Sequence, residues 1–361
     1  METRSRKVLG GVIVFLVAIT FPMLLGIEAV FSQAVTIKMG DADTVVELTL
    51  DKTNGEYASQ NIKSQAFKRY IEQASNGRIS VKIFPDCQLG GEREQWEMTK
   101  AGSLDMNGLS TGPLANFVPE VMATQIPYMF KDSNVALKVI NGPVGQELVD
   151  VIVKKMGVRV LAWQHETNYN FMAMKKSIKV PEDLKGMKIR TVENPAIIEF
   201  TKLTGASPTP IPFNELYTSV QQGIVDGVNL GIVFVHFTGL DALIKHINLA
   251  DPWLSLGTIS INEKFYRSLS PQDQYLVKEA AMKASATYQG LAYMARDLWN
   301  EYLRNKGIEI YNPSSQEMEK WVSTLNPPMT QWVKKQIGPE WVDKIFKANK
   351  EAEQELYGHI K

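Results

Sequence analysis

The chain has 361 residues, of which 44% are hydrophobic and 22% charged, and these are ordinary values for about two globular domains. Its 39 basic and 39 acidic residues give a formal net charge of +0, so the sequence lacks the basic excess of a nucleic-acid-binding protein. The single cysteine, Cys87, excludes an intramolecular disulfide and is interpreted as a small packing residue.

Residues 1–34 have the organisation of an export signal. Basic residues lie within 4–7, a largely apolar and uncharged run covers 8–27, and Ser-Gln-Ala at 32–34 offers small residues for cleavage. The apolar run is also long enough to span a bilayer, so a retained N-terminal anchor is the alternative. Pro22 interrupts the run, and with the small residues after it this favours a cleaved signal peptide.

The next segment predicts a strand–helix–strand unit. A strand over 35–39 opens toward Asp41, a helical apolar pattern follows, and residues 78–84 alternate as a second strand. Because such a unit is a right-handed crossover, its strands should be parallel, and ligands bind outside the carboxyl ends of parallel strands. Asp41 and the loop that leads to Glu92 are therefore expected near a cleft.

Polar and aromatic residues follow the next two predicted strands. The strand over 104–110 ends at Ser110, whose hydroxyl belongs either to an ordinary turn or to a solute cleft. A clear amphipathic helix over 143–156 leads to a strand over 158–163. The segment after it is rich in side chains of the kind that line solute clefts, namely Trp163, His165, Tyr169 and Asn170.

Residues 183–230 read as strand, helix, extended loop, helix and strand. Asn194 and Pro195 are a helix cap and a first helical residue. Arg190 lies on a strand that should be mostly buried, and a buried guanidinium needs a carboxylate partner. That partner is either a protein side chain, such as Glu193 or Asp226, or a ligand.

The last third of the chain contains β-rich runs at 233–236 and 253–262, and then a long helix. Ser270 and Pro271 begin this helix, which runs to about residue 305 and so measures roughly 50 Å, longer than one small domain. Helices separated by Pro327–Pro328 and by Gly338–Pro339 follow. The four histidines lack metal-ligand spacing, and no nucleophile motif is present, so no metal, cofactor or catalytic residue is expected.

The segments DLKGMKIR, NP, GASPTPIPF, ELY, QQG and VDG within 183–227 closely resemble the central part of DctP-type periplasmic solute-binding proteins of tripartite ATP-independent periplasmic (TRAP) transporters. PDCQLGGEREQWEMTKAGSLDM at 85–106 and STGPLANFVPEVMATQIPYMF at 110–130 also resemble family segments. The resemblance implies a two-lobed α/β periplasmic-binding-protein fold with mostly parallel sheets, a hinge and a long lobe-bridging helix. It places one lobe at 35–167 plus about 256–292, and the other at 168–255 plus about 293–361.

The resemblance also assigns the ligand site. Arg190 matches the arginine that clamps the ligand carboxylate, and Phe213 matches an aromatic residue that packs on the ligand. Asn170 stands where the family often has a second arginine, and Asn229 and Leu230 stand where it often has Glu-Asn. We therefore expect a ligand with one carboxylate and a more neutral remainder, such as a sugar acid, a hydroxy or keto acid or an aromatic acid.

The expected function is capture of a small organic acid in the periplasm and its delivery to TRAP membrane subunits, by a monomer or homodimer that catalyses no reaction. A ligand-sensing protein that presents its state to a receptor is an alternative, and an exported enzyme acting on organic acids is a weaker one. The candidate ligand-binding residues are Arg190, Phe213, Asn170, Asn229, Glu92, Trp163, His165, Tyr169, Ser110 and Asp41.

Overall fold

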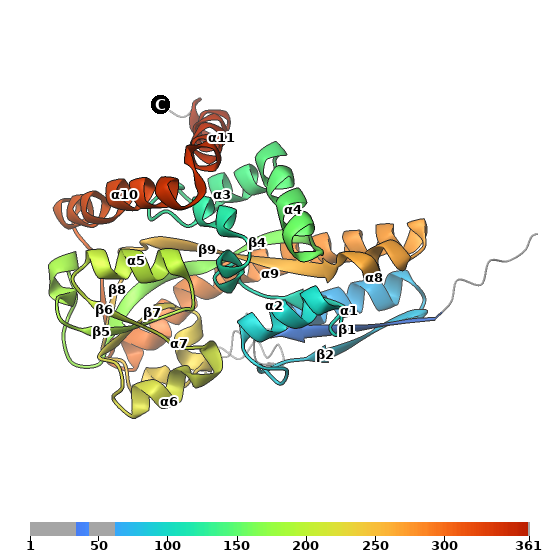
Figure 1. Cartoon of the computed structure of the whole chain (residues 1–361). Coiled ribbons are helices and arrows are strands. Elements are labelled where there is room, and N and C mark those ends of the chain that lie inside the picture. The colour runs from blue at the N-terminus through green and yellow to red at the C-terminus, as the bar shows by residue number, and fades with distance from the viewer. Residues whose placement is uncertain (1–33, 43–61, 360–361) are drawn as a thin grey trace, which may run out of the picture. The chain divides into compact units, whose positions relative to one another are not determined.

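Ten strands of the described residues form one mixed sheet (Figure 1). The computed structural model describes residues 34–42 and 62–359, so the expected export signal lies outside the described part. The sheet order is β2-β1-β3-β9-β4-β7-β5-β6, with β8 pairing with β4 and β10 pairing with β8. The strands are β1 (Val35–Asp41), β2 (Ile79–Phe84), β3 (Met106–Gly108), β4 (Val158–Ala173), β5 (Lys188–Thr191), β6 (Ser207–Pro210), β7 (Gly227–Gly231), β8 (His246–Asn248), β9 (Trp253–Asn262) and β10 (Glu309–Tyr311).

Helices cover both sides of the strands. They are α1 (Ile62–Ala74), α2 (Glu92–Ala101), α3 (Ser133–Ile140), α4 (Pro143–Met156), α5 (Pro195–Leu203), α6 (Leu216–Gln221), α7 (Phe234–Phe237), α8 (Glu263–Ser268), α9 (Pro271–Asn305), α10 (Ser315–Ile337) and α11 (Pro339–Tyr357). Short 3-10 helices cover Pro113–Asn116, Pro119–Thr124, Pro181–Leu184, Phe213–Glu215 and Leu240–Ala242. No helix in the described part of the chain is both long and apolar enough to cross a membrane.

The first strand group consists of β1, β2 and β3, which are mutually parallel. The predicted strand–helix–strand unit is confirmed as β1–α1–β2, with Val35 in register with Ile79. Its core includes Met39 and Phe67, which are fully buried. Asp41 therefore lies at the carboxyl end of β1, beside Gly108 at the end of β3.

The second strand group consists of β5, β6 and β7, which are also mutually parallel. In Figure 1, α5 and α10 lie over one side of these strands, and α6 and α7 lie below the other. Phe171 of the neighbouring strand β4 packs edge-on against Phe200 of α5 and stacks on Trp321 of α10, with ring centroids 6.1 and 5.6 Å apart. These contacts bury one face of the sheet in the main hydrophobic core.

The two long strands β4 and β9 connect the strand groups, and they run antiparallel to each other. The expectation of mostly parallel sheets therefore holds within each group, whereas the whole sheet is mixed. The sequence predicted that β4 would end at residue 163, but it continues to Ala173 because β9 and then β7 satisfy its backbone as it crosses. The polar residues between Trp163 and Asn170 are thus strand residues.

Two other predictions were wrong. The β-rich run at 233–236 forms the short helix α7, because the chain turns directly after β7. Pro327 and Pro328 lie inside α10 instead of separating two helices. A proline inside a helix costs about 3 kcal/mol, and here the fully buried side chains of Trp321 and Met329 on the same helix offset that cost through tertiary packing.

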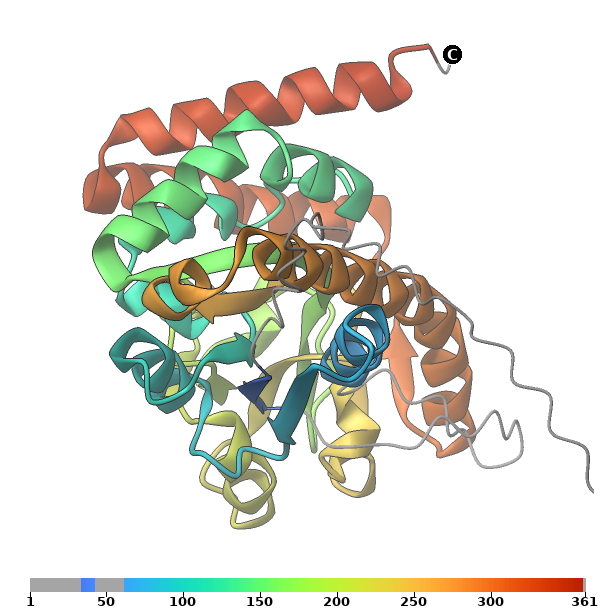
Figure 2. The same ribbon diagram turned by 90° about the vertical axis from the view of Figure 1, so that its right-hand side faces the viewer.

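The long helix α9 spans Pro271–Asn305, as predicted, and contacts α1, the crossing strands β4 and β9, and α7. At its middle, Thr287 hydrogen-bonds Tyr70 of α1 over 2.9 Å. Near its end, Trp299 packs edge-on against Phe237 of α7 at 5.2 Å. Figure 2 shows α9 in orange beside α1 in blue. The described residues belong to one compact unit, Ala34–Lys361, and the division into two lobes stays a prediction.

Candidate functional site

Arg190 is the centre of the candidate site. It lies in β5, one residue before the carboxyl end of the strand, and only 1% of the residue is exposed. Its Nε donates a hydrogen bond to the carbonyl oxygen of Ile211 over 3.0 Å. Ile211 follows the neighbouring strand β6, so the guanidinium reaches across the carboxyl ends of two parallel strands. This is the edge where parallel sheets bind ligands.

The charge of Arg190 has no carboxylate partner within 4.0 Å among the described residues. Neither Glu193 nor Asp226, the two side chains expected as alternatives to a ligand, forms an ion pair with it; the Asp226 carboxylate accepts from the Lys188 backbone instead, over 2.9 Å. Nη1 of Arg190 is buried and has no hydrogen-bond partner in the described part of the chain. Burial lowers the pKa of the guanidinium, since a low-dielectric environment penalises the charged form. An anion at Nη1 would satisfy both the charge and the unused donor.

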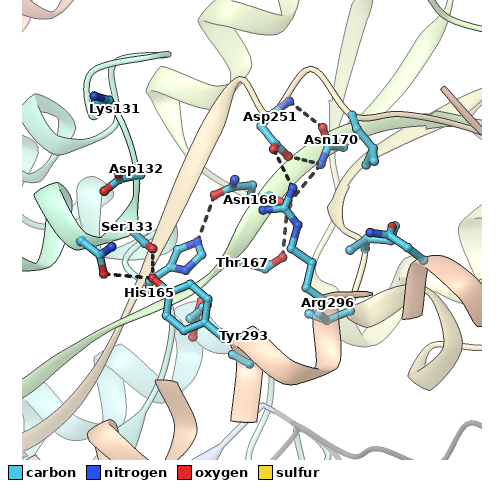
Figure 3. A pocket seen from close by; sticks show the side chains of 17 residues that line it. Lys131, Asp132, Ser133, His165, Thr167, Asn168, Asn170, Asp251, Tyr293 and Arg296 are labelled. Atoms are coloured by element: carbon cyan, nitrogen blue, oxygen red, sulfur yellow. Dashed lines mark hydrogen bonds and ion pairs between the residues drawn. The ribbon is translucent and has the colours of Figure 1, made fainter. Parts of the chain in front are cut away.

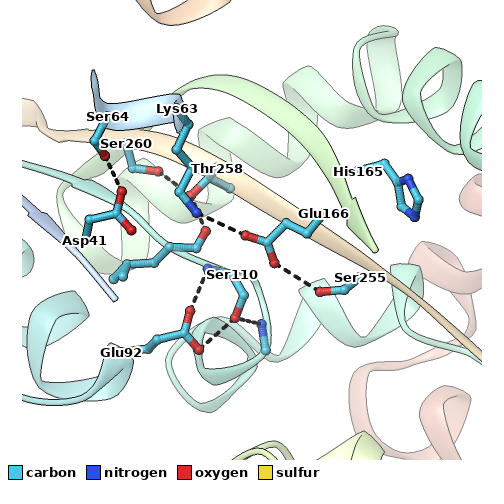
Figure 4. Close-up of polar contacts among 12 residues, drawn as sticks. Asp41, Lys63, Ser64, Glu92, Ser110, His165, Glu166, Ser255, Thr258 and Ser260 are labelled. Atoms are coloured by element: carbon cyan, nitrogen blue, oxygen red, sulfur yellow. Dashed lines mark hydrogen bonds and ion pairs between the residues drawn. The ribbon is translucent and has the colours of Figure 1, made fainter. Parts of the chain in front are cut away.

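Glu92 and Ser110 lie near Arg190 on the side of the first strand group. The Glu92 carboxylate accepts from the backbone N–H of Ser110 over 2.8 Å and from its hydroxyl over 2.9 Å (Figure 4). Glu92 also interacts electrostatically with Arg190. Because Glu92 is the first residue of α2, its negative charge is also favoured by the amino end of that helix. Two residues from distant parts of the sequence thus meet at the arginine.

Aromatic residues form a further side of the candidate site. Phe213 is half-buried and packs edge-on against Phe234 at 5.7 Å. Tyr169 lies 6.3 Å from Phe234 and 4.5 Å from Trp253, and its phenol interacts electrostatically with Arg190. The structure therefore brings Tyr169 and Phe213 together around Phe234, which the sequence did not single out.

The strand register separates the two amides at which the chain departs from the family pattern. Arg190 pairs with Val228 of β7, and Val228 pairs with Met172 of β4, so these three residues share one face of the sheet. Asn170 and its partner Leu230 lie two residues further along and share that face. Asn229 pairs with Phe171 and lies on the opposite face. On the face of the sheet that carries Arg190, the chain thus has the apolar Leu230 at the position where the family often has an asparagine.

Asn229 is nevertheless unusual, because both of its side-chain polar atoms are buried without a partner among the described residues. The hydroxyls of Thr191, at the end of β5, and Thr111, in the loop after Ser110, are buried and unpartnered in the same sense. Unsatisfied buried polar groups cost about 1–3 kcal/mol each. The two hydroxyls lie at or after strand ends, which is consistent with a site that binds a polar molecule, whereas Asn229 lies in the middle of β7 on the opposite face from Arg190.

Asn170 and His165 line a cavity of about 320 Å³ next to α9 (Figure 3). Both ends of the Asn170 amide are occupied: Nδ2 donates to the Asp251 carboxylate over 2.8 Å, and Oδ1 accepts from the Asp251 backbone over 2.8 Å. His165 shares a 3.0 Å hydrogen bond with Asn168, and burial lowers the pKa of its imidazole to about 4. These two residues lie apart from the contacts of Arg190.

A buried polar cluster lies at the carboxyl ends of β1 and β3 (Figure 4). Asp41 is fully buried and accepts a hydrogen bond from Ser64. Lys63 of α1 forms an ion pair with Glu166 of β4 at 3.3 Å, with 2% and 4% of the two side chains exposed. Glu166 also accepts from Ser255 of β9 over 3.2 Å. This cluster joins the first strand group to both crossing strands.

Sequence reasoning missed Lys63 and Glu166. Neither residue was singled out: Lys63 lies at the start of the helical apolar pattern, and Glu166 lies inside a polar segment. A lysine at the start of a mostly buried helix was the available signal. Trp163, by contrast, lies elsewhere: it lines a separate cavity of about 600 Å³ and accepts from Ser285 through its carbonyl oxygen over 2.7 Å.

These features define a class of protein. An α/β sheet carries a buried, unpaired arginine and polar side chains at the ends of its parallel strands. The described residues contain no group of three or more His, Cys, Asp or Glu side chains that could hold a metal ion. Such a site suits an α/β binding protein that takes up an anion.

Comparisons with known proteins identify the family. The model of the bacterial extracellular solute-binding protein family 7, DctP, matches residues 52–336. A solute-binding protein of Verminephrobacter eiseniae is 30% identical over 307 residues, which cover 85% of this chain and 90% of that protein. The chain therefore belongs to the DctP family of TRAP periplasmic solute-binding proteins, whose members bind solutes and are not enzymes.

Solved structures agree with this assignment. A TRAP periplasmic solute-binding protein from Polaromonas sp. JS666, bound to D-erythronate, is 28% identical with a TM-score of 0.77, covering 86% of this chain and 98% of that one. The sugar acid binding protein of Advenella mimigardefordensis, in complex with galactonate, is 23% identical with a TM-score of 0.81, covering 89% and 99%. The second likeness concerns the fold alone. The expected periplasmic-binding-protein fold is thus confirmed.

Proposed function

We propose that this protein captures a small organic acid in the periplasm by clamping its carboxylate on Arg190, and delivers it to the membrane subunits of a TRAP transporter. The observation that carries the proposal is the buried guanidinium of Arg190, which lacks an ion-pair partner among the described residues and has an unpartnered Nη1. A protein that retains such a costly group needs a compensating ligand. A carboxylate matches the planar donor geometry of arginine.

The remainder of the ligand should be neutral and hydroxylated or partly apolar. Asn170, which replaces a second arginine of the family pattern, is held by Asp251, and Leu230 adds an apolar group on the face of Arg190. Phe213 and Tyr169 supply aromatic surface, and Ser110 supplies a hydroxyl held by Glu92. The relative with bound D-erythronate supports a sugar acid or a related hydroxy acid.

Binding would close the two lobes predicted for the chain, since ligand contacts come from both strand groups. Contacts that would belong to the closed form lie beside Arg190. Asn194 donates through Nδ2 to the Gly112 carbonyl oxygen over 2.6 Å, and Asn116 donates to the Glu193 carbonyl oxygen over 2.6 Å. A ligand that contacts both groups would shift the population toward this form, which the membrane subunits would recognise.

The test is a thermal-shift screen of the exported protein against organic acids, each paired with its neutral amide or alcohol. A ligand at a hundred times its dissociation constant adds about 2.7 kcal/mol to the stability of the folded state, which raises the melting temperature by a few degrees. We expect shifts with acids and none with their neutral partners. Shifts with the neutral compounds alone would overturn the clamp at Arg190.

A further inference from the structure

We propose that Asn194 is a positioning residue that fastens the loop 110–112 to the strand of Arg190 and thereby slows the release of a bound acid. The inference rests on the proposed function, because it assumes that the acid binds at Arg190 between these two chain segments. It deepens that function by assigning retention of the acid to a side chain outside the carboxylate clamp. Gln125 is the partner of Asn194 in this role.

Each residue of the loop 110–112 is held by a side chain from another part of the chain. The Glu92 carboxylate accepts from the backbone N–H and the hydroxyl of Ser110. Gln125, which is 1% exposed, donates through Nε2 to the carbonyl oxygen of Thr111 over 3.0 Å. The Thr111 N–H in turn donates to a carbonyl oxygen of β9 over 2.8 Å. These contacts fix the loop to α2 and to a crossing strand.

Asn194 supplies the link from the strand of Arg190. It lies four residues after Arg190, and its Nδ2 donates to the carbonyl oxygen of Gly112 over 2.6 Å and to Oε1 of Gln125 over 2.9 Å. The approach is close, because a Cβ atom placed on Gly112 would lie 3.2 Å from the side chain of Val192. Segments from the two sides of the candidate site therefore meet through one amide.

The same side chain begins helix α5. Its Oδ1 accepts from the N–H of Ile197 over 3.0 Å, which is the usual contact of an N-cap residue. A cap needs only an acceptor, and aspartate or serine would serve as well. The Nδ2 donor is therefore not required by the helix and serves the loop. Because Asn194 is fully buried, loss of this donor would remove a hydrogen bond from both of its acceptors.

This arrangement makes release of the acid depend on the Asn194 amide. In the binding mode proposed above, Arg190 holds the acid from one segment and Ser110 lies on the other. The acid leaves when the two segments separate, and the contacts of Asn194 must break in that step. A weaker link makes separation more frequent and dissociation faster. Association begins with the segments apart, so its rate should change little.

Asn194→Asp removes the link and keeps the helix cap. Aspartate caps a helix as well as asparagine does, and its negative charge is favoured at the amino end of α5. An ionised carboxylate donates no hydrogen bond, so it repels the oxygens of Gly112 and Gln125.

Asn262→Asp is the matched control. Asn262 caps α8 by accepting from the N–H of Phe265 over 2.9 Å, and its Nδ2 donates to the carbonyl oxygen of Thr99 over 2.9 Å. It pairs with Val158 at the start of β4, whereas the strand group of Arg190 pairs with the other end of β4. The two variants therefore make the same chemical change inside and outside the proposed link.

Calorimetry and stopped-flow measurements with D-erythronate and D-gluconate give the affinities and rates, and thermal unfolding gives the stability of the ligand-free proteins. Asn194→Asp should weaken binding about tenfold or more, mainly through faster dissociation, since each of its two lost hydrogen bonds is worth roughly a factor of five. Asn262→Asp should bind as the wild type does. The melting temperatures of the two ligand-free variants should lie close together, because each keeps its cap and loses its amide donor.

Gln125→Met is a second test that leaves the cap of α5 untouched. Methionine fills a similar volume but neither accepts from Asn194 nor donates to Thr111, so dissociation should be roughly fivefold faster. The double variant should dissociate more slowly than the product of the two single effects predicts, because both changes break the same contact.

Wild-type dissociation rates in both Asn194→Asp and Gln125→Met, with binding lost in Arg190→Met, would overturn the inference and leave the proposed function standing. Equal losses of affinity in Asn194→Asp and Asn262→Asp would also overturn it, since they would show a general effect on the fold. If neither acid binds the wild type, the inference and the sugar-acid class proposed above fall together.

Discussion

Arg190 and Ile211 are joined by one hydrogen bond, in which Nε of the arginine donates to the carbonyl oxygen of Ile211 over 3.0 Å. The Ile211 N–H in turn donates to the carbonyl oxygen of Thr191 over 3.1 Å, so the two chain segments hold each other. A neutral carbonyl orients the planar guanidinium but leaves its charge uncompensated. The arginine is thus positioned in advance for an anion, and a stability cost accompanies that positioning.

Replacement of Arg190 by methionine should stabilise the ligand-free protein and abolish binding of the acid. Met fills a similar volume without a charge, and removal of an unpaired buried charge should raise the free energy of unfolding of the ligand-free protein by about 1–3 kcal/mol. The same change should abolish the ligand-induced rise in melting temperature. Thermal unfolding with and without the acid identified by the screen measures both effects.

Arg159 provides the matched control for that experiment. It forms a two-pronged ion pair with Glu263, in which Nε and Nη2 each lie 2.6 Å from a carboxylate oxygen. Arg159→Met should therefore lower the melting temperature, since it leaves the Glu263 carboxylate with the largely exposed Arg267, 2.7 Å away, as its ion-pair partner, and should leave acid binding intact. A destabilised Arg190→Met protein that still binds acid would show that Arg190 is a structural residue.

Replacement by alanine should lower the free energy of unfolding at Gly257 and raise it at Gly290. A Cβ atom on Gly257 would lie 2.4 Å from the Glu166 carboxylate, so Gly257→Ala must displace one partner of the buried Lys63–Glu166 pair. Disruption of a buried ion pair costs about 3–5 kcal/mol. Gly290 lies inside α9 with no atom within 4 Å of a Cβ position, so Gly290→Ala should stabilise the helix by about 1 kcal/mol.

Denaturant unfolding of the two glycine variants measures the free energies directly. A Gly257→Ala protein as stable as the wild type would mean that the Glu166 side chain relocates without cost. A destabilised Gly290→Ala protein would mean that α9 needs an irregular backbone at that residue.

The sequence predicted those elements whose signals are local. Helix α4 over 143–156, strand β9 over 253–262 and helix α9 up to residue 305 matched their expected bounds, because apolar periodicity and capping residues lie within each element. The position of Arg190 on a buried strand was likewise predicted, because a single charged residue within an apolar strand pattern is easily recognised.

Features that depend on distant partners escaped prediction. The polar residues 163–170 form a strand only because β9 and β7 pair with them, and the run 233–236 turns into a helix only because β7 ends just before it. Lys63 and Glu166 are 103 residues apart in sequence, and nothing local marks either as a partner of the other. Asn170 matched a family ligand position, yet its amide is occupied by Asp251.

Asn170→Ala tests whether the Asn170 amide stabilises the folded protein or contacts the ligand. The substitution leaves the Asp251 carboxylate with the more distant Arg296, 3.6 Å away, and should lower the free energy of unfolding by about 1–2 kcal/mol. Affinity for the acid should change less than twofold if the amide only links β4 to the segment before β9. Calorimetric titration of the variant decides the question, and a loss of tenfold or more would return Asn170 to the ligand site.

His165 should make the protein sensitive to acid. Burial lowers the pKa of the imidazole from the usual 6.5 to about 4 in the folded state, with Asn168 acting in the opposite direction. Between these two values the unfolded chain binds a proton that the folded chain does not, so stability is fully present above about pH 6.5 and is lost as the pH falls toward 4. At about pH 4.5 the loss from this one group should be about 2–3 kcal/mol.

Replacement of His165 by glutamine removes the titration and retains a polar group beside Asn168. Urea unfolding of the wild type and His165→Gln at about pH 7.5 and about pH 4.5 isolates the histidine, because all other carboxyl and imidazole groups contribute equally to both proteins. The variant should lose about 2–3 kcal/mol less than the wild type over this range. Replacement of the exposed His359 by glutamine is the matched control for the change in side chain. Superimposable profiles for wild type and His165→Gln would show that the imidazole is readily protonated in the folded protein, and the cavity beside α9 would then be open to water.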